Sequence, residues 1–408
     1  MPELPDKRRL YRLPWSRNDN PIAWLEVTDV CNFACQGCYR RTLTGHKSLA
    51  EIEAELDFFA RWRNPDCVSI AGGEPLLHPE IDRIVAAIAR RKLKPVMLTN
   101  AHLLDAARVR ALAAAGLAGF TLHIDRNQPR PGIAPECEAD LNPVRQHYAD
   151  MIAAQPGLSA FFNLTVFPET VDEIAAVVAW ARSQPAKVDG LIFITYRTAT
   201  TDRLAWIDSE EERAALEQLT YVAPDDGTPL LDAARVHDVI KKVLPAYDAC
   251  AYLGGTARHD TYKWLVGCSV AAPGAAFGAL GARSMELTQL LHHLWYGTYV
   301  SYRAKSAAHA PVFLIGAFDA RMRRAAVRWL GWAARNPLRL FRRIHLQSIV
   351  IVQPPDVLPD GSIDMCDSCP DMTVHEGELV NSCRLDEYRL LGGMRAALPS
   401  ASGDADDA

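Results

Sequence analysis

The stretch Val27-Thr28-Asp29-Val30-Cys31-Asn32-Phe33-Ala34-Cys35-Gln36-Gly37-Cys38-Tyr39 decides the fold. It continues the apolar run 22–27, whose composition predicts a buried strand. Three thiols at x3 and x2 spacing on one loop can bind three irons of a four-iron cluster, which leaves the fourth iron without a protein ligand. An open position marks a metal centre that does chemistry, as it does in catalytic zinc sites.

Composition and charge limit the classes of protein. The chain has 408 residues, 10 cysteines and a formal net charge of -5, so we expect no nucleic-acid partner. Residues 1–20 are charged and have no apolar core, and no run of 18 apolar residues occurs, so neither a secretory signal nor a membrane-spanning helix is expected. Cysteines in such a chain favour metal ligation over disulfides and predict a cytoplasmic protein.

A glycine-rich turn follows the next predicted strand. The apolar run 67–71 leads directly into Gly72-Gly73-Glu74-Pro75, and we expect Cys67 to be a buried packing residue. The glycines allow close approach of the backbone to a ligand, and the carboxylate can hold an ammonium group. By itself the segment could be an ordinary strand-to-loop turn. Its position after the three cysteines and a predicted helix over 49–63 favours a ligand site.

Strand, loop and helix alternate up to about residue 200. Further strands are predicted over 94–100, 119–125, 160–166 and 188–194, and further helices over 104–115, 141–154 and 170–183. This alternation predicts an α/β fold with a parallel sheet, whose sites lie at the C-terminal ends of the strands. The polar residues at these ends are candidate cofactor or substrate contacts: Asn100, His123, Asp125 and Asn163. Each could instead be a turn or cap residue, and His123 a satisfied half-buried histidine.

The CxxxCxxC motif, combined with Gly-Gly-Glu-Pro downstream, resembles the radical S-adenosylmethionine superfamily. The alternative is a zinc or redox knuckle, which the glycine-rich segment disfavours. The resemblance covers residues 22–200 and implies a partial (β/α)6 barrel, similar to a TIM barrel. It implies a [4Fe-4S] cluster on Cys31, Cys35 and Cys38, whose open iron binds S-adenosylmethionine. It also implies that Tyr39 is the aromatic residue that the family carries beside the last cysteine of the motif. The segment that meets the methionine amino group would be Gly72, Gly73, Glu74 and Pro75.

A second cysteine group has C-x2-C-x13-C spacing and consists of Cys366, Cys369 and Cys383. Residues 372–374 and 378–380 predict a hairpin about His375-Glu376-Gly377, with the glycine at positive φ, that returns Cys383 to the other two. The spacing resembles twitch or SPASM-type regions, especially that of the GTP-cyclising enzyme of molybdenum-cofactor biosynthesis, and implies an auxiliary [4Fe-4S] cluster. Zinc is the alternative, with His375, Cys250 or Cys268 as fourth ligand.

The match to that enzyme fails where a triphosphate must be held. The enzyme has arginines directly after its CxxC, whereas residues 370–373 here are Pro-Asp-Met-Thr. Its Gly-Gly tail also differs, because Gly392-Gly393 here are followed by fifteen further residues. Without guanidinium groups a triphosphate would be bound poorly, so we take the cysteine geometry from the resemblance and decline the substrate.

Residues 216–345 are expected to form a largely helical insert that concerns the substrate. Residues 266–282 are mostly small, which allows close backbone packing or leaves room for a long apolar ligand. A helix is predicted over 283–295. Residues 321–345 hold eight arginines and no acidic residue, with Pro337 separating two helical pieces. Arginine interleaved with Trp and Leu is typical of a helix in a membrane interface, and the alternative is a solvated basic face over a buried apolar stripe.

The sequence predicts five regions: a 1–21 extension, a 22–215 barrel, a 216–345 substrate or membrane-docking region, a 346–394 cysteine-rich hairpin domain and a 395–408 disordered acidic tail. We expect a cytoplasmic radical S-adenosylmethionine enzyme, reduced by flavodoxin or ferredoxin. It would abstract hydrogen from an unactivated carbon of a lipid or other apolar substrate, with possible docking to the inner face of the membrane through 321–345. The alternatives are a peptide-modifying maturase and a cluster-bearing, non-catalytic regulator.

Overall fold

The apolar runs predicted as strands come together in one sheet. The computed structural model describes residues 5–41, 43–197, 199–200, 209–219, 222–223, 230–258, 260–301, 307–308, 312–358 and 362–394. Six strands pair in parallel in chain order: β2 (Ile22–Thr28), β3 (Cys67–Gly72), β4 (Lys94–Thr99), β5 (Gly119–His123), β6 (Ser159–Val166) and β7 (Gly190–Thr195). Every residue of β6 is buried, as expected for a parallel strand covered on both faces.

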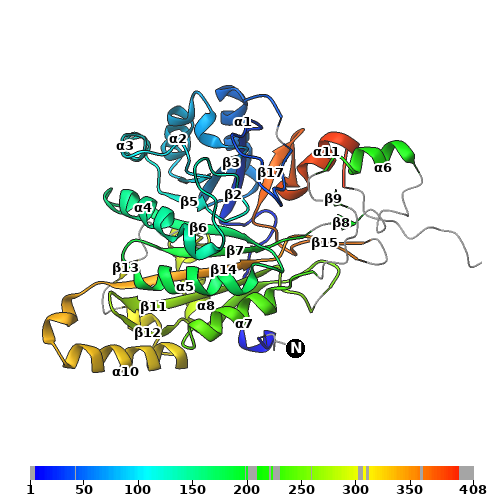
Figure 1. The fold of residues 1–408 in the computed structure, drawn as a ribbon. Helices are drawn as coiled ribbons and strands as arrows, with labels where there is room; N and C mark the ends of the chain where they lie inside the picture. Colours follow the sequence, from blue (N-terminus) through cyan, green and yellow to red (C-terminus); the bar gives the residue numbers. More distant parts are fainter. Residues whose placement is uncertain are drawn as a thin grey trace, which may run out of the picture.

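Helices connect these strands and flank the sheet (Figure 1). They are α1 (Leu49–Trp62), α2 (Ile81–Arg90), α3 (Ala106–Ala114), α4 (Asn142–Ala153) and α5 (Ile174–Ser183). The first begins where Ser48 and Glu51 form a capping box, a signal present in the sequence. The α/β alternation predicted over residues 22–200 is therefore confirmed.

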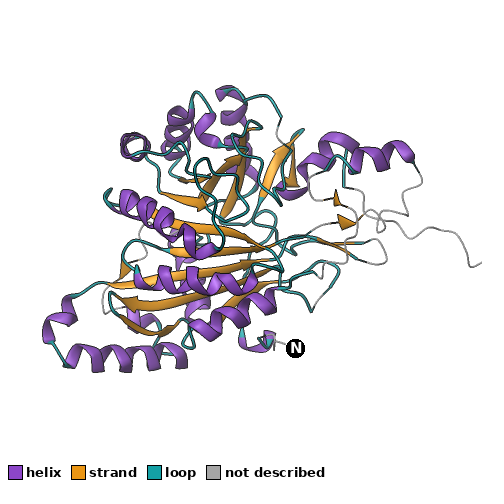
Figure 2. Cartoon of the chain, in the orientation of Figure 1, coloured by secondary structure: helices purple, strands orange, loops and turns teal. Residues whose placement is uncertain are grey.

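The sheet extends beyond β7 and does not close into a barrel. Its order is β1-β10-β11-β14-β7-β6-β5-β4-β3-β2, with the short strand β13 (Ala307–Ala308) beside β14. The added strands are β1 (Tyr11–Arg12), β10 (Ala249–Leu253), β11 (Trp264–Ala272), β12 (Ala275–Ala279) and β14 (Ile344–Val352). Of these, β14 pairs in parallel with β7, whereas β11 pairs with β14 in the antiparallel sense. Figure 2 shows the long strands side by side.

The segment 216–345 is only partly the helical insert that the sequence predicts. It carries α7 (Ala233–Val243), α8 (Ala282–Tyr296), α9 (Val312–Ile315) and α10 (Ala320–Ala334), and α6 (Glu210–Leu216) precedes it. It also supplies β10, β11 and β12, which the sequence analysis does not predict. The small residues 266–282 form most of the β11–β12 hairpin, and their uniform size hides the alternation that identifies a strand.

Close packing explains these small residues. A Cβ atom on Gly267 would lie 2.3 Å from the ring of Tyr247, and one on Gly278 would lie 3.2 Å from the Cβ of Ala325 in α10. At these two positions the space beside the hairpin is occupied by the protein's own side chains, which favours the packing interpretation of this run.

The C-terminal part returns to the sheet before it reaches the second cysteine group. As predicted, α10 ends before Pro337, and a 3-10 turn follows over Pro337–Phe341. β14 begins at Ile344, so the boundary expected between residues 345 and 346 falls inside a strand of the main sheet.

Short elements complete the fold: β8 (Ala199–Thr200) beside β9 (Val222–Ala223), β15 (Asp356–Val357) beside β16 (Ile363–Asp364), and α11 (Leu385–Leu391). The predicted hairpin is β17 (Met372–His375) and β18 (Glu378–Asn381), with Gly377 at φ 80°. The expected tail over 395–408 lies outside the described residues.

Candidate active site

One cavity at the C-terminal ends of the parallel strands is lined by both cysteine groups. Cys31, Cys35 and Cys38 come from the loop after β2. From more than 300 residues further along the chain come three more: Cys366, Cys369 and Cys383. The six predicted metal ligands therefore share one chamber, which the sequence alone could not show.

The glycines of the Gly-Gly-Glu-Pro segment pack against the first cysteine loop. The Gly73 amide donates to the Thr28 carbonyl at 2.7 Å, and a Cβ atom on Gly73 would lie 2.1 Å from the Val30 carbonyl oxygen. Gly72 has φ 120°, and a Cβ there would lie 2.2 Å from the Thr28 oxygen. Both glycines also line the cavity. They therefore hold the cysteine loop in place as well as exposing backbone to the chamber.

Glu74 faces the same chamber with its carboxylate held by three donors. Its oxygens accept hydrogen bonds from the Thr99 hydroxyl at 2.7 Å, the Asn100 amide at 2.8 Å and the Leu76 amide at 3.1 Å. Burial nevertheless raises its pKa, because desolvation disfavours the charged form. A cationic ligand group would offset that penalty. Pro75 begins a 3-10 turn and is absent from the cavity lining, so its part is to shape the turn.

The first three thiols suit a cationic iron centre. Burial, with the neighbouring Cys38 next in importance, raises the pKa of Cys35 to about 12. Burial raises the pKa of Cys31 and of Cys38 as well. Three half-buried sulfurs whose pKa values are all raised need a positive centre to become thiolates, which an iron–sulfur cluster supplies. The donor set thus fits a cluster.

The second group also gathers three sulfurs. A hydrogen bond with Cys369, followed by burial, raises the pKa of Cys366 well above its usual range. Burial and the same Cys369 sulfur raise the pKa of Cys383. The hairpin has therefore brought Cys383 back beside the CxxC pair. In the part of the chain that the structure describes, no three His, Cys, Asp or Glu side chains lie close enough to share a single metal ion.

The candidates for a fourth zinc ligand lie elsewhere. Cys250 and Cys268 are buried in a separate hydrophobic cluster that includes Leu13 and Trp15, and neither lines the cavity. His375 packs edge-on against Tyr388, with ring centroids 6.3 Å apart. Cys67 is buried in β3, as predicted for a packing residue.

His123 lines the cavity and Asp125 orients it from behind. The Nε2 atom of His123 lies 2.7 Å from Oδ2 of Asp125, which also accepts the Thr165 amide. Burial acts to raise the pKa of Asp125, but His123 and the backbone donors outweigh it, so the pKa is lowered. Asp125 is not part of the lining, so of the two predicted contacts only His123 can meet a ligand there.

Two polar atoms face the chamber without a partner. Oδ1 of Asn163 and Oγ1 of Thr195 are buried and accept or donate no hydrogen bond within the described chain. Asn100, which also lines the cavity, differs from these two residues, because its side-chain Nδ2 donates a hydrogen bond to Oδ1 of Asn32 at 2.7 Å. Tyr39 packs edge-on against Trp24, with centroids 6.4 Å apart, and both line the cavity.

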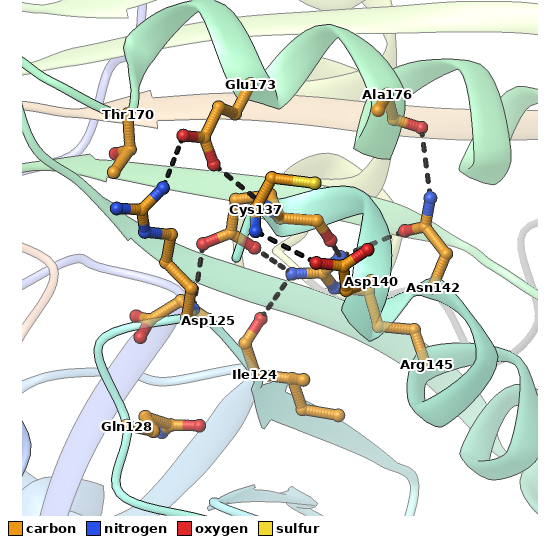
Figure 3. Close-up of polar contacts among 12 residues, drawn as sticks. Ile124, Asp125, Gln128, Cys137, Asp140, Asn142, Arg145, Thr170, Glu173 and Ala176 are labelled. Carbon is orange, nitrogen blue, oxygen red and sulfur yellow. Dashed lines mark hydrogen bonds and ion pairs between the residues drawn. The ribbon is translucent and has the colours of Figure 1, made fainter. Parts of the chain in front are cut away.

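The loop after β5 is fixed by a buried ion pair on its outer side. Arg145, which is fully buried, pairs with Glu138 and donates to the Ile124 carbonyl at 2.8 Å. Figure 3 shows these contacts beside Asp125 and Gln128 on the same loop. Gln128 hydrogen-bonds to Cys35 and lines the cavity. The sequence analysis missed it because no strand-end signal marks it.

The two arginines of the lining are already paired. Arg197 forms an ion pair with Asp356, and Arg384 meets both oxygens of Glu387 at 2.5 and 2.6 Å. Apolar side chains supply much of the remaining wall: Ile194, Trp264, Val352, Pro354, Pro355 and Val357. The sequence analysis identified none of these, because they converge from three separate segments.

Residues 25–181 match the family model described as the radical SAM superfamily. This part of the chain is a radical SAM domain. Among curated relatives, GTP 3',8-cyclase 1 of Mycobacterium tuberculosis is 28% identical over 196 residues, covering 43% of this chain and 52% of the relative. AdoMet-dependent heme synthase of Nitratidesulfovibrio vulgaris is 30% identical over 108 residues, covering 26% and 29% of the two chains. The chain spans about half the length of the cyclase and less than a third of the heme synthase.

Solved structures of lower identity also match part of this chain. SuiB of Streptococcus suis bound to S-adenosylmethionine matches at 17% identity and a TM-score of 0.40, covering 55% of this chain and 47% of SuiB.

Proposed function

We propose that this radical SAM enzyme cleaves S-adenosylmethionine reductively and abstracts hydrogen from an unactivated carbon of an apolar substrate. The observation that carries the proposal is the single chamber lined by both cysteine groups and by the glycine-rich segment. When bound, the [4Fe-4S] cluster and S-adenosylmethionine supply a 5'-deoxyadenosyl radical. The protein's part is to hold the reactants and keep water out.

Cys31, Cys35 and Cys38 would hold the catalytic cluster. Glu74, on the neighbouring wall, has the charge to receive the methionine ammonium group. Asn163 and Thr195 have hydrogen-bonding capacity left for the nucleoside or the substrate. His123 is oriented by Asp125 toward the same space.

Cys366, Cys369 and Cys383 would hold a second [4Fe-4S] cluster across the chamber. One nearby positive charge supports this: Arg63, fully buried, donates to the Cys369 carbonyl at 2.8 Å and to the Pro370 carbonyl at 2.6 Å. A hydrogen bond with Cys366 lowers the pKa of Cys369 and Arg63 acts in the same direction, whereas burial and Asp371, which also lines the cavity, act to raise it.

The walls favour a lipid or other apolar substrate. Both arginines of the lining are committed to carboxylates, so a polyanion such as a triphosphate would find no unpaired guanidinium there. Tryptophan, valine and proline side chains instead offer apolar contact. The electron would come from flavodoxin or ferredoxin, and residues 321–345 would bring the enzyme to a membrane surface. None of the helices in the described part of the chain is long and apolar enough to cross a membrane.

The test is formation of 5'-deoxyadenosine by the reconstituted enzyme with a strong reductant. Cys35→Ala should abolish it while the iron signal of the C-terminal group remains. Cys137→Ala is the matched control, because Cys137 lies outside the cavity lining, and it should leave formation unchanged. Formation by Cys35→Ala at the wild-type rate would refute the site, and no formation by the wild type would favour a non-catalytic regulator.

The substrate class has its own test. The lipid profile of a host lacking the gene should regain a lipid species when complemented with the wild-type chain and not with Cys35→Ala. An unchanged lipid profile, with 5'-deoxyadenosine formation intact, would refute the lipid part of the proposal and favour the peptide-modifying alternative.

A further inference from the structure

The outer face of α10 and the turn after it is a basic surface with no acidic residue. Residues 320–355 contain eight arginines and no Asp or Glu, in a chain whose formal net charge is -5. Arg321 pairs with Asp248. Among the described residues, the other seven arginines, between 323 and 343, form no ion pair with a carboxylate. Charge of one sign is therefore concentrated on one side of an acidic protein.

The apolar stripe of α10 is already used by the protein itself. Met322, Ala325, Trp329 and Ala333 are buried against the β11–β12 hairpin and its neighbours. The alternative interpretation of this segment, a solvated basic face over a buried apolar stripe, is therefore correct about the stripe. The helix cannot present this stripe to a partner, so any docking must use its outer side.

That outer side exposes apolar side chains among the arginines. The exposed fractions are 74% for Phe318, 68% for Val327, 54% for Leu330, 73% for Leu338 and 81% for Phe341. A shallow hollow lined by Arg323, Arg324, Val327 and Arg328 lies on the same helix. In Figure 1, α10 and the turn after it form the outer edge of the molecule.

We propose that the outer face of α10 and the turn 337–343 docks this protein on an anionic lipid bilayer. Guanidiniums without a carboxylate partner complement lipid phosphates, and Leu338 and Phe341 can enter the acyl boundary between them. A nucleic acid would use the arginines but leave the exposed aliphatic side chains in water, and the tryptophans that could stack on bases are withdrawn. Trp329 is buried, and Arg339 lies over the Trp332 ring at 4.7 Å.

The proposal rests on the proposed function and deepens its lipid part, because docking on a bilayer would place the enzyme where a lipid substrate is found. Its test does not use catalysis. Full-length protein is sedimented with vesicles of phosphatidylcholine alone or mixed with phosphatidylglycerol, at low and high salt. We expect binding only to the anionic vesicles, and its loss on raising NaCl from about 0.05 to about 0.5 M, since the Debye length shortens.

The decisive variant is the triple substitution Arg324→Glu, Arg335→Glu and Arg342→Glu, which should weaken binding at least about 100-fold, at about fivefold or more per arginine. The control triple, Arg9→Glu, Arg110→Glu and Arg182→Glu, makes the same charge change at exposed arginines elsewhere and should bind close to wild type.

Three results would overturn the proposal: no wild-type binding to anionic vesicles, equal losses in both triples, or tighter binding to a short RNA than to vesicles. Formation of 5'-deoxyadenosine by the same preparations separates this failure from failure of the proposed chemistry. A double variant, Leu338→Ser with Phe341→Ser, should bind more weakly without changing the salt dependence.

Discussion

Arg63 holds the second cysteine group to the parallel sheet at β2, and its removal should loosen that group. Its guanidinium is fully buried at the end of α1. It donates to four backbone carbonyls, those of Ile22 at 2.5 Å, Arg17 at 3.0 Å, Cys369 at 2.8 Å and Pro370 at 2.6 Å. The last two belong to the CxxC loop, so one side chain joins segments 306 residues apart in sequence.

Arg63→Met keeps the length of the side chain and removes all five N–H donors. Leaving a buried acceptor without its partner costs at least about 1 kcal/mol, so four carbonyls suggest roughly 4 kcal/mol. Burial acts in the opposite direction: it lowers the pKa of Arg63 to about 10, which means that the charged form loses hydration in the folded state. We therefore expect a net destabilisation of about 2–4 kcal/mol.

The assay is anaerobic urea unfolding, followed together with the iron content of each variant. Arg63→Met should lower the unfolding midpoint and lose iron preferentially from the C-terminal group. Arg61→Met, on the exposed side of the same helix, is the control and should stay within about 0.5 kcal/mol of wild type. Full iron retention and unchanged stability in Arg63→Met would refute this account of the anchor.

Three further perturbations test the contacts around the chamber. Gly73→Ala should sharply lower the iron content of the first cysteine group, because its Cβ would meet a carbonyl of the cysteine loop at 2.1 Å; Gly331→Ala, with open space around it, should retain its iron. Asp386→Asn removes the negative charge that lies 3.0 Å from the Arg40 guanidinium. We expect it to lower the free energy of unfolding in urea by about 3 kcal/mol, and a decrease of under about 1 kcal/mol would argue against a stabilising role for this buried ion pair.

The third perturbation is pH. Burial lowers the pKa of His78, so on acidification the unfolded chain binds a proton at a higher pH than the folded chain does. The free energy of unfolding should therefore decrease as the pH drops below about 6.5, the ordinary pKa of histidine. In His78→Gln, urea midpoints at pH 5 and pH 7 should differ less than in wild type. Equal slopes would exclude His78.

Much of the fold could be predicted from local pattern. The strands from β2 to β7 and their helices follow from apolar runs separated by amphipathic segments, because each such unit buries its apolar residues in the same way. The hairpin about Gly377 was predicted for a similar reason, since its turn needs a positive φ. Strands β11 and β12 were missed because their residues are too uniformly small to show a period.

The sequence by itself determined which thiols can converge within the first cysteine loop, because the spacing within one short loop limits how far apart they can lie, and it predicted the hairpin that lies between Cys369 and Cys383. Only the tertiary structure decided that both groups face one chamber, that Arg197 and Arg384 are neutralised there, and that the apolar stripe of α10 is buried. These facts depend on contacts between segments hundreds of residues apart, and no local pattern records such distant pairings.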